Sequence, residues 1–107
     1  MRAPCIALFA SLCACSSSNN CPAADCTAFP TFQGCFDDHH GVEGFSVSRA
    51  IEICCIDHPI GMAKMNTVCG DTAATCQTYV QMNLTPASAS TAEVMQACTD
   101  YVHDRGP

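Results

Sequence analysis

The chain has 107 residues, so it holds at most one domain. Four basic residues against ten acidic ones give a net charge of −6, which excludes a basic nucleic-acid-binding face and a polybasic membrane patch. Eleven residues are cysteines, and this proportion is typical of a disulfide scaffold that compensates for a thin core.

The first residues have the layout of an export signal. Arg2 gives a short positive start, and residues 3–12 form an apolar stretch too short to span a bilayer. The sequence LCAC at 12–15 resembles the lipobox of bacterial lipoproteins, and this resemblance implies that Cys15 is acylated after cleavage. The apolar stretch also suits a eukaryotic secretory signal, with cleavage at nearly the same place.

We therefore expect three segments. Residues 1–14 form a cleaved signal peptide, residues 15–25 a flexible tether rich in serine and asparagine, and residues 26–107 the folded domain. The protein is expected to be exported to the cell envelope or the extracellular space. It is either anchored to a membrane through a lipid on Cys15 or secreted freely.

The number of cysteines agrees with this processing. Cleavage removes two cysteines, and acylation or loss of Cys15 takes a third out of disulfide bonding. Eight then remain, which permits four bridges in 105 connectivities. These eight predicted disulfide cysteines are Cys21, Cys26, Cys35, Cys54, Cys55, Cys69, Cys76 and Cys98.

The N-terminal third of the folded domain is expected to be irregular. Residues 16–34 show no periodicity, and CFDDHHGVEGF at 35–45 predicts a polar loop closed by two glycines. Apolar residues then recur at helical spacing in SVSRAIEICCIDH at 46–58. This pattern predicts a helix that is capped by Ser46 or Ser48 and stopped by the following proline.

Three more helical segments follow. GMAKMNTVC at 61–69 is a short helical candidate, and Asp71 is placed to cap a helix over 72–83. Ser90 and Glu93 form a capping box for a last helix that ends near the C-terminus. No stretch alternates as a strand does. The predicted fold class is therefore all-α, a small disulfide-rich domain of three to four short helices with an irregular N-terminal segment.

Two motifs resemble one enzyme family. The CC-x-x-H pattern at 54–58 resembles the active-site helix of secreted phospholipases A2, and CGDTAATC at 69–76 resembles that family's next helix. In the family these helices are antiparallel and bridged. The resemblance therefore implies a Cys54–Cys76 disulfide, with His58 as general base and Asp71 beside it.

The same comparison argues against the activity. Pro59 stands where the family has its calcium-binding aspartate, so the electrophile that polarises the ester is missing. We therefore expect a protein without catalytic activity, and a phospholipase-like hydrolase, or its inactive relative, is the alternative.

A run of four ligand-type residues forms a second candidate site. Carboxylates and imidazoles bind ions such as Zn²⁺ or Cu²⁺, although four adjacent residues rarely all point at one ion. His58 or His103 would complete such a site if the fold brought it close. The four residues are Asp37, Asp38, His39 and His40.

These observations favour a binding protein. We expect an exported, non-catalytic domain that binds a partner protein or a small apolar ligand, with no cofactor and no nucleic-acid partner. Several methionines in a chain poor in leucine could line an apolar pocket. A metal-binding envelope protein that uses the 37–40 run is the further alternative.

Overall fold

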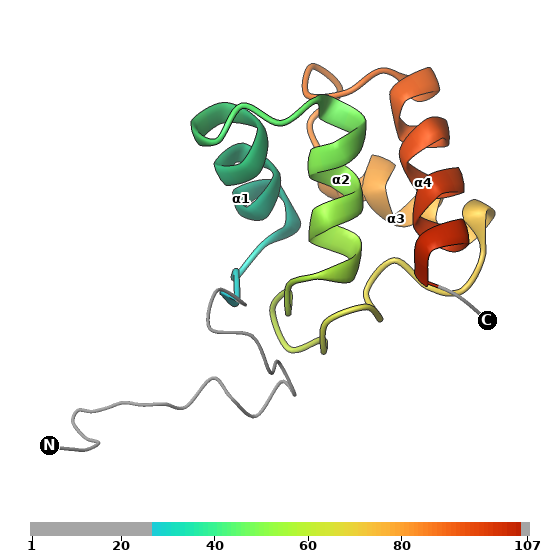
Figure 1. The fold of residues 1–107 in the computed structure, drawn as a ribbon, viewed down its shortest axis with the longest axis horizontal. Helices are drawn as coiled ribbons and strands as arrows, with labels where there is room; N and C mark the ends of the chain where they lie inside the picture. The colour runs from blue at the N-terminus through green and yellow to red at the C-terminus, as the bar shows by residue number, and fades with distance from the viewer. Residues whose placement is uncertain (1–26, 106–107) are drawn as a thin grey trace, which may run out of the picture.

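The computed structural model describes residues 27–105, and every regular element in this range is a helix (Figure 1). The elements are α1 (Phe32–Phe36), the π-helix η2 (Asp37–Val42), α2 (Val47–Ile56), α3 (Ala73–Asn83) and α4 (Thr91–Arg105). Besides these helices, the range contains two isolated bridges, which join Ile60 to Phe29 and to Ala63. The predicted all-α class is confirmed.

Helix α2 lies in the middle of the domain. Helix α4 packs along one side of α2, α1 and η2 lie on the other side, and α3 packs against α4 (Figure 1). Within residues 27–105, no helix is both long and apolar enough to cross a bilayer. The facing sides bury six cysteines together with Phe32, Ala50, Ile51, Val80, Val94, Ala97 and Tyr101.

Side chains cap the helices much as the sequence predicts. The Ser46 hydroxyl accepts a hydrogen bond from the Arg49 N–H at 3.2 Å, which makes Ser46 the N-cap of α2. Ahead of α4, the Glu93 N–H donates to the Ser90 hydroxyl at 3.1 Å, and the Ser90 N–H donates to the Glu93 carboxylate at 2.8 Å. The predicted capping box is confirmed.

The cap of α3 differs from the prediction. Thr72 has the extended backbone of an N-cap, and its hydroxyl accepts from the Thr75 N–H at 3.1 Å, while the Thr75 hydroxyl accepts from the Thr72 N–H at 3.2 Å. Asp71 was expected in this role. Its carboxylate instead forms an ion pair with Arg105 near the end of α4, at 3.3 Å.

The helix predicted over 61–69 is also wrong. These residues form a series of turns. Gly61 and Asn66 have positive φ angles of 58° and 62°, which interrupt a right-handed helix. The segment folds back on itself through the bridge between Ile60 and Ala63, and it ends at Cys69, which a disulfide holds.

Three disulfides connect these elements. Both sulfurs of each pair lie on fully buried residues, so the bridges form part of the core and also restrict the unfolded chain. The pairs are Cys35–Cys54 between α1 and α2, Cys55–Cys69 between α2 and the following loop, and Cys76–Cys98 between α3 and α4.

This pairing contradicts the Cys54–Cys76 bridge that the phospholipase resemblance implies, since each of the two cysteines is bonded elsewhere. The remaining predicted disulfide cysteines, Cys21 and Cys26, lie outside the described residues. So do the predicted signal peptide, the tether and Cys15.

Three of the four methionines within residues 27–105 lie at the surface. Met62, Met82 and Met95 are exposed, and Met62 shows 98% of its surface to solvent. The buried residues of α4 are Val94, Ala97, Cys98 and Tyr101, and Met95 lies outside this buried face.

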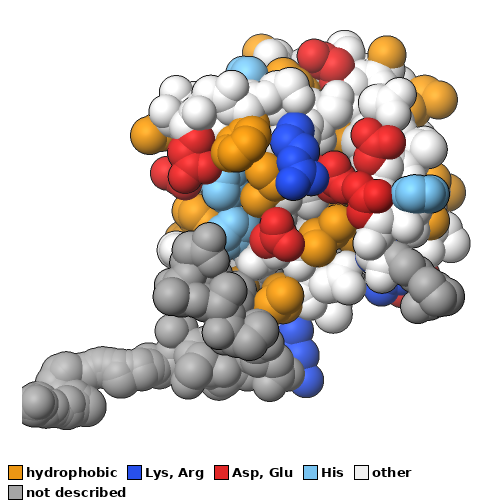
Figure 2. Space-filling view, viewed as in Figure 1, with side chains coloured by type: hydrophobic (Ala, Val, Ile, Leu, Met, Phe, Trp, Pro, Cys, Tyr) orange, Lys and Arg blue, Asp and Glu red, His pale blue; other side chains and the backbone are white. Residues whose placement is uncertain are grey.

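One carboxyl group is buried between α2 and α4. Glu52 is 5% exposed; its Oε1 atom accepts from Arg49 at 2.9 Å, and its Oε2 atom has no hydrogen-bond partner among the described residues. Burial raises the pKa of Glu52, the nearby carboxylate of Asp104 raises it further, and Arg49 offsets part of this effect. Figure 2 shows acidic side chains gathered beside a basic one over α2 and α4.

The substitution Glu52→Gln should stabilise the protein at neutral pH. A raised folded-state pKa means that Glu52 contributes stability below its ordinary pKa of 4.5 and loses this contribution as the pH rises through the folded-state value. Glutamine keeps the shape without the buried charge, and its amide can donate to Asp104. We expect a gain of up to about 1 kcal/mol near pH 7 that disappears below pH 4.5.

The measurement is urea denaturation of both proteins across this pH range. Glu93→Gln is the control, because hydrogen bonds from Ser90 lower the pKa of Glu93, so its contribution is present at neutral pH and is lost on acidification. At neutral pH, the free energy of unfolding should therefore be higher than that of the native protein for Glu52→Gln and lower for Glu93→Gln. A Glu52→Gln variant less stable than the native protein there would contradict the assignment.

Candidate metal centre

Residues 35–42 are helical, in contrast to the polar loop that the sequence predicts over 35–45. Thr31 caps α1 by accepting from the Gly34 N–H at 3.0 Å, and Phe32, Cys35 and Phe36 anchor that helix in the core. The chain then continues without a break into η2, where the N–H of residue 43 donates to the Asp38 carbonyl five residues earlier. A π-helical turn is rare, and such turns occur frequently at functional sites.

This turn places His39 against the end of α2. His39 is 8% exposed, and its Nδ1 atom lies 2.8 Å from a carboxylate oxygen of Glu43, one turn further along. Since a carboxylate only accepts hydrogen bonds, Nδ1 of His39 is the donor. The Nε2 atom at the other end of the ring points toward α2.

His58 comes from the segment after α2. The helix ends at its C-cap Asp57, and the next residues run alongside the start of the domain: the Phe29 N–H donates to the Pro59 carbonyl at 3.0 Å, and the Gly61 N–H donates to the Phe29 carbonyl at 2.8 Å. These bonds hold His58, which is 5% exposed and donates from Nδ1 to the Thr27 carbonyl at 2.6 Å.

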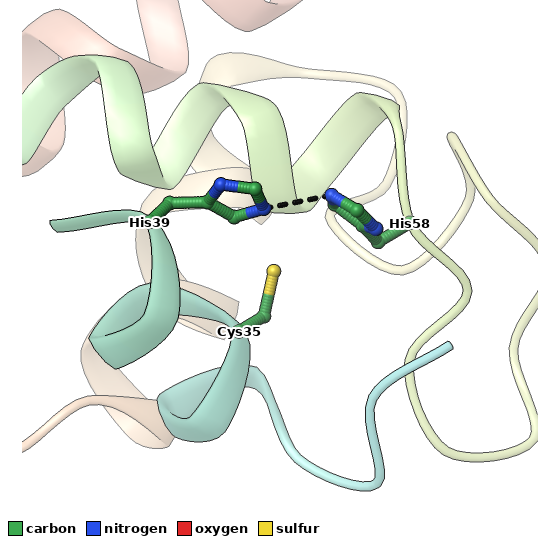
Figure 3. A group of neighbouring side chains, drawn as sticks. All are labelled: Cys35, His39 and His58. Atoms are coloured by element: carbon green, nitrogen blue, oxygen red, sulfur yellow. Dashed lines mark hydrogen bonds between the residues drawn. The ribbon is translucent and has the colours of Figure 1, made fainter. Parts of the chain in front are cut away.

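The two imidazoles meet at their Nε2 atoms. The Nε2 atoms of His39 and His58 are 2.8 Å apart, and the ring centroids are 4.7 Å apart (Figure 3). The chain Glu43–His39–His58–Thr27 is therefore continuous, with an acceptor at each end. Both histidines are buried, with 8% of His39 and 5% of His58 exposed to solvent.

The hydrogen-bond partners determine where the protons lie. Nδ1 is the donor on each ring, because the Glu43 carboxylate and the Thr27 carbonyl accept. The Nε2 lone pairs of His39 and His58 then face each other across 2.8 Å. A hydrogen or a metal ion between these two atoms would bridge the rings.

Aromatic rings and a sulfur atom surround the pair. The ring of Phe29 stands edge-on to both imidazoles, with centroids 5.1 Å from His58 and 6.1 Å from His39. Phe45 lies 6.1 Å from His39 on the outer side. The Cys35 sulfur is within 4.8 Å of a ring nitrogen of each histidine (Figure 3). This sulfur is bonded to that of Cys54 in a disulfide.

Of the four predicted metal ligands, only His39 points into this site. Asp37 accepts a hydrogen bond from Gln33 at 3.0 Å on the outside of the helix. His40 contacts the Phe45 carbonyl at 2.7 Å and stacks on Phe36. Adjacent residues on a helical turn point in different directions, so a four-residue run cannot converge on one point.

Asp38 and His103 are the two remaining candidate ligands, and only Asp38 lies near the histidine pair. Asp38 offers an oxygen within 4.8 Å of both His39 and Glu43, so it belongs to the outer side of the cluster. His103 is exposed near the end of α4, where its Nδ1 atom contacts the next residue, Asp104, at 3.0 Å. Of the two histidines suggested to complete the site, the fold therefore brings in His58.

The arrangement that the phospholipase resemblance implies is absent from residues 27–105. Both ring nitrogens of His58 are engaged, by Thr27 and by His39, and Asp71 pairs with Arg105 instead. His58 therefore lacks the free nitrogen that a general base needs, and the expected aspartate does not orient it.

An apolar groove lies elsewhere, at the turn between α3 and α4. It has a volume of about 350 Å³, and Val80, Leu84, Pro86 and Val94 are among its lining residues. No methionine lines this groove, in contrast to the methionine-lined pocket that the sequence suggests. A group of neighbouring sulfurs, those of Cys55, Cys69 and Cys76, belongs to two disulfides and has no free thiol.

The chain matches no protein-family model, no curated protein and no solved structure.

Proposed function

We propose that this chain is an exported, non-catalytic binding protein and that its ligand is a transition-metal ion held between His39 and His58. The observation that carries the proposal is the convergence of the two Nε2 atoms while both Nδ1 atoms donate to fixed acceptors. Histidines that bind metals typically donate their second N–H to a carboxylate or a backbone carbonyl, which fixes the ring and raises its basicity.

The donor set favours Zn²⁺, Cu²⁺ or Ni²⁺, because imidazole suits these ions better than hard ions such as Ca²⁺. Zinc–nitrogen bonds of about 2.0–2.1 Å at a tetrahedral angle place two nitrogens about 3.3 Å apart. The Nε2 atoms would therefore have to separate by about half an ångström from their present 2.8 Å. Because both Nε2 atoms must offer a lone pair to the ion, binding should release any hydrogen held between them to the buffer.

Two protein ligands leave coordination positions open. A structural zinc site is closed by four protein ligands, whereas open positions accept water or a ligand from another molecule. Phe45, whose ring centroid lies 6.1 Å from that of His39, is 40% exposed, whereas the two histidines are buried. The open coordination positions fit a protein that holds an exchangeable ion better than one that uses the ion to fold.

Substitution of either histidine should abolish tight binding. We expect the native protein to bind one Zn²⁺ or Co²⁺ per chain, and His39→Ala or His58→Ala to weaken binding by at least about 100-fold, because one ligand of two is lost. The measurement is isothermal titration calorimetry of the disulfide-intact protein after treatment with a chelator and dialysis.

Two further variants serve as controls. His103→Ala removes an exposed histidine away from the site and should bind like the native protein. Glu43→Gln keeps an acceptor for His39 but removes its charge, and should weaken binding by about 10-fold. Equal binding by the native protein and both histidine variants would refute the site, and so would an equal loss in His103→Ala.

The proposed export rests on the N-terminal pattern, and the disulfides are consistent with an oxidising, extracellular environment. We expect the native protein to lack residues 1–14 and to show eight disulfide-bonded cysteines. Intact mass before and after reduction and alkylation measures both properties. A chain that starts at Cys15 with an acyl-sized excess of mass identifies a lipid-anchored protein. A lipid-free chain that starts just after Cys15 identifies a secreted protein. A chain that starts at Met1 with free thiols contradicts export.

A further inference from the structure

We infer that Cys35 becomes a third metal ligand when the Cys35–Cys54 disulfide is reduced, so that the redox state of this disulfide sets the affinity of the site. The inference rests on the proposed metal-binding function and adds its regulation. It starts from the convergence of three ligand atoms: the Cys35 sulfur and one ring nitrogen each of His39 and His58 all lie within 4.8 Å of one another.

The backbone brings these three atoms together. Cys35 lies on the buried face of α1, and His39 follows four residues later on the continuous α1–η2 helix, so both side chains face the end of α2. His58 enters from the segment after α2. All three residues are buried, with exposed fractions of 0%, 8% and 5%, and Figure 3 shows the sulfur beside the gap between the two rings.

Other sulfurs do not share this position. The Cys54 sulfur is bonded to that of Cys35, but it is not among the atoms that converge with the two nitrogens. The sulfurs of Cys55, Cys69 and Cys76 form a separate group without a histidine. Among the described cysteines, Cys35 is therefore the one whose thiolate would complete a mixed nitrogen and sulfur site.

The chemistry depends on the sulfur being a thiolate. In the disulfide the Cys35 sulfur is neutral and a poor ligand. A dithiol reductant supplies two electrons and two protons: the Cys35–Cys54 bond breaks, two thiols form, and the reductant becomes a cyclic disulfide. The Cys35 thiol then loses its proton to the buffer as its sulfur bonds the metal. Two imidazoles and one thiolate form a set that favours zinc or copper, and it still has one open position.

Metal binding and the redox state of the Cys35–Cys54 disulfide must influence each other. If the thiol form binds the ion more tightly than the disulfide form, the bound ion favours the thiol form by the same factor. A metal ion would therefore protect Cys35 from oxidation, and formation of the disulfide would weaken the hold on the ion.

Two variants of the full mature chain test this, because they lose the same disulfide and differ only in the sulfur that remains. Cys54→Ser leaves the Cys35 thiol beside the histidines, whereas Cys35→Ser leaves the Cys54 thiol. With Co²⁺ as the probe, we expect Cys54→Ser to show sulfur-to-cobalt charge-transfer absorption and to bind at least about 10-fold more tightly than the oxidised native protein. Cys35→Ser should lack the absorption band and bind like the oxidised native protein.

The outcomes separate the inference from the function on which it rests. If the oxidised native protein binds Co²⁺ at its histidines but Cys54→Ser shows no charge-transfer band, the inference fails and the proposed function stands. If none of the three proteins binds Co²⁺, both fail. An equal band in Cys35→Ser would also overturn the inference, since the sulfur of Cys54 would then serve as well.

If Cys54→Ser does not fold, the native protein is reduced with a dithiol in the presence of Co²⁺, and the reduced cysteines are identified by alkylation and mass. We expect the charge-transfer band to rise as the thiols of Cys35 and Cys54 appear. Reduction of this pair without the band would overturn the inference.

Discussion

Removal of the Cys76–Cys98 disulfide is expected to lower the free energy of unfolding by about 3 kcal/mol. The bridge closes a loop between residues 22 positions apart and joins α3 to α4. Helix α3 depends on it, because the buried residues of this helix are Cys76 and Val80 alone. A domain of this size typically has only about 5–15 kcal/mol of stability, so the loss would be a large share of the total.

The measurement is urea denaturation of a Cys76→Ala/Cys98→Ala double variant, with far-ultraviolet circular dichroism to follow helix content. The matched comparison is Cys55→Ala/Cys69→Ala, which opens a loop with a separation of 14 residues. We expect the Cys76–Cys98 variant to be the less stable of the two and to lose helical signal first. A loss below about 1 kcal/mol would contradict the dependence of α3 on its bridge.

Substitution of Tyr101 by alanine is expected to destabilise the protein by about 3–5 kcal/mol, as is usual for truncation of a large core aromatic side chain. Tyr101 on α4 is completely buried, and its hydroxyl donates to the Gly70 carbonyl at 2.5 Å. The Arg105 guanidinium lies 5.5 Å from the centre of its ring and pairs with Asp71. Tyr101 therefore holds the turn before α3 against the last helix.

The Tyr101→Phe variant separates the two contributions. It keeps the ring in the core and removes only the hydrogen bond to Gly70, so we expect a loss of about 1 kcal/mol. Chemical denaturation of the two variants and the native protein gives both values. If Tyr101→Phe lost as much as Tyr101→Ala, the hydroxyl rather than the packing of the ring would account for the effect.

The helices illustrate which local features can be predicted from sequence. The α2 and α4 segments have apolar residues at helical spacing and a good capping residue. Helix α2 begins after Ser46, one of its two predicted caps, and α4 begins after its predicted cap, Ser90. Interactions within a few residues decide such features. The prediction over 61–69 is wrong because positive φ angles at Gly61 and Asn66 follow from how this segment packs, not from its periodicity.

The candidate site shows the reverse case. The DDHH run at 37–40 correctly indicates the segment that contains the site. Because this segment was interpreted as a loop, the directions of its side chains could not be predicted. Under a helical interpretation, Glu43 lies four residues after His39 on the same face, and this spacing was the one available signal for it. The Thr27 carbonyl has no signal in the sequence, since any residue carries that group.

The sequence by itself determined the class of this protein: an all-helical, cysteine-rich domain in which capping and periodicity place α2 and α4. Only the tertiary structure decided which cysteines pair and which histidines meet. The nitrogens of His39 and His58 converge because a π-helical turn directs one ring and backbone hydrogen bonds to Phe29 hold the segment of the other. Contacts between residues 19 positions apart depend on the packing of whole elements, and local propensity does not specify that packing.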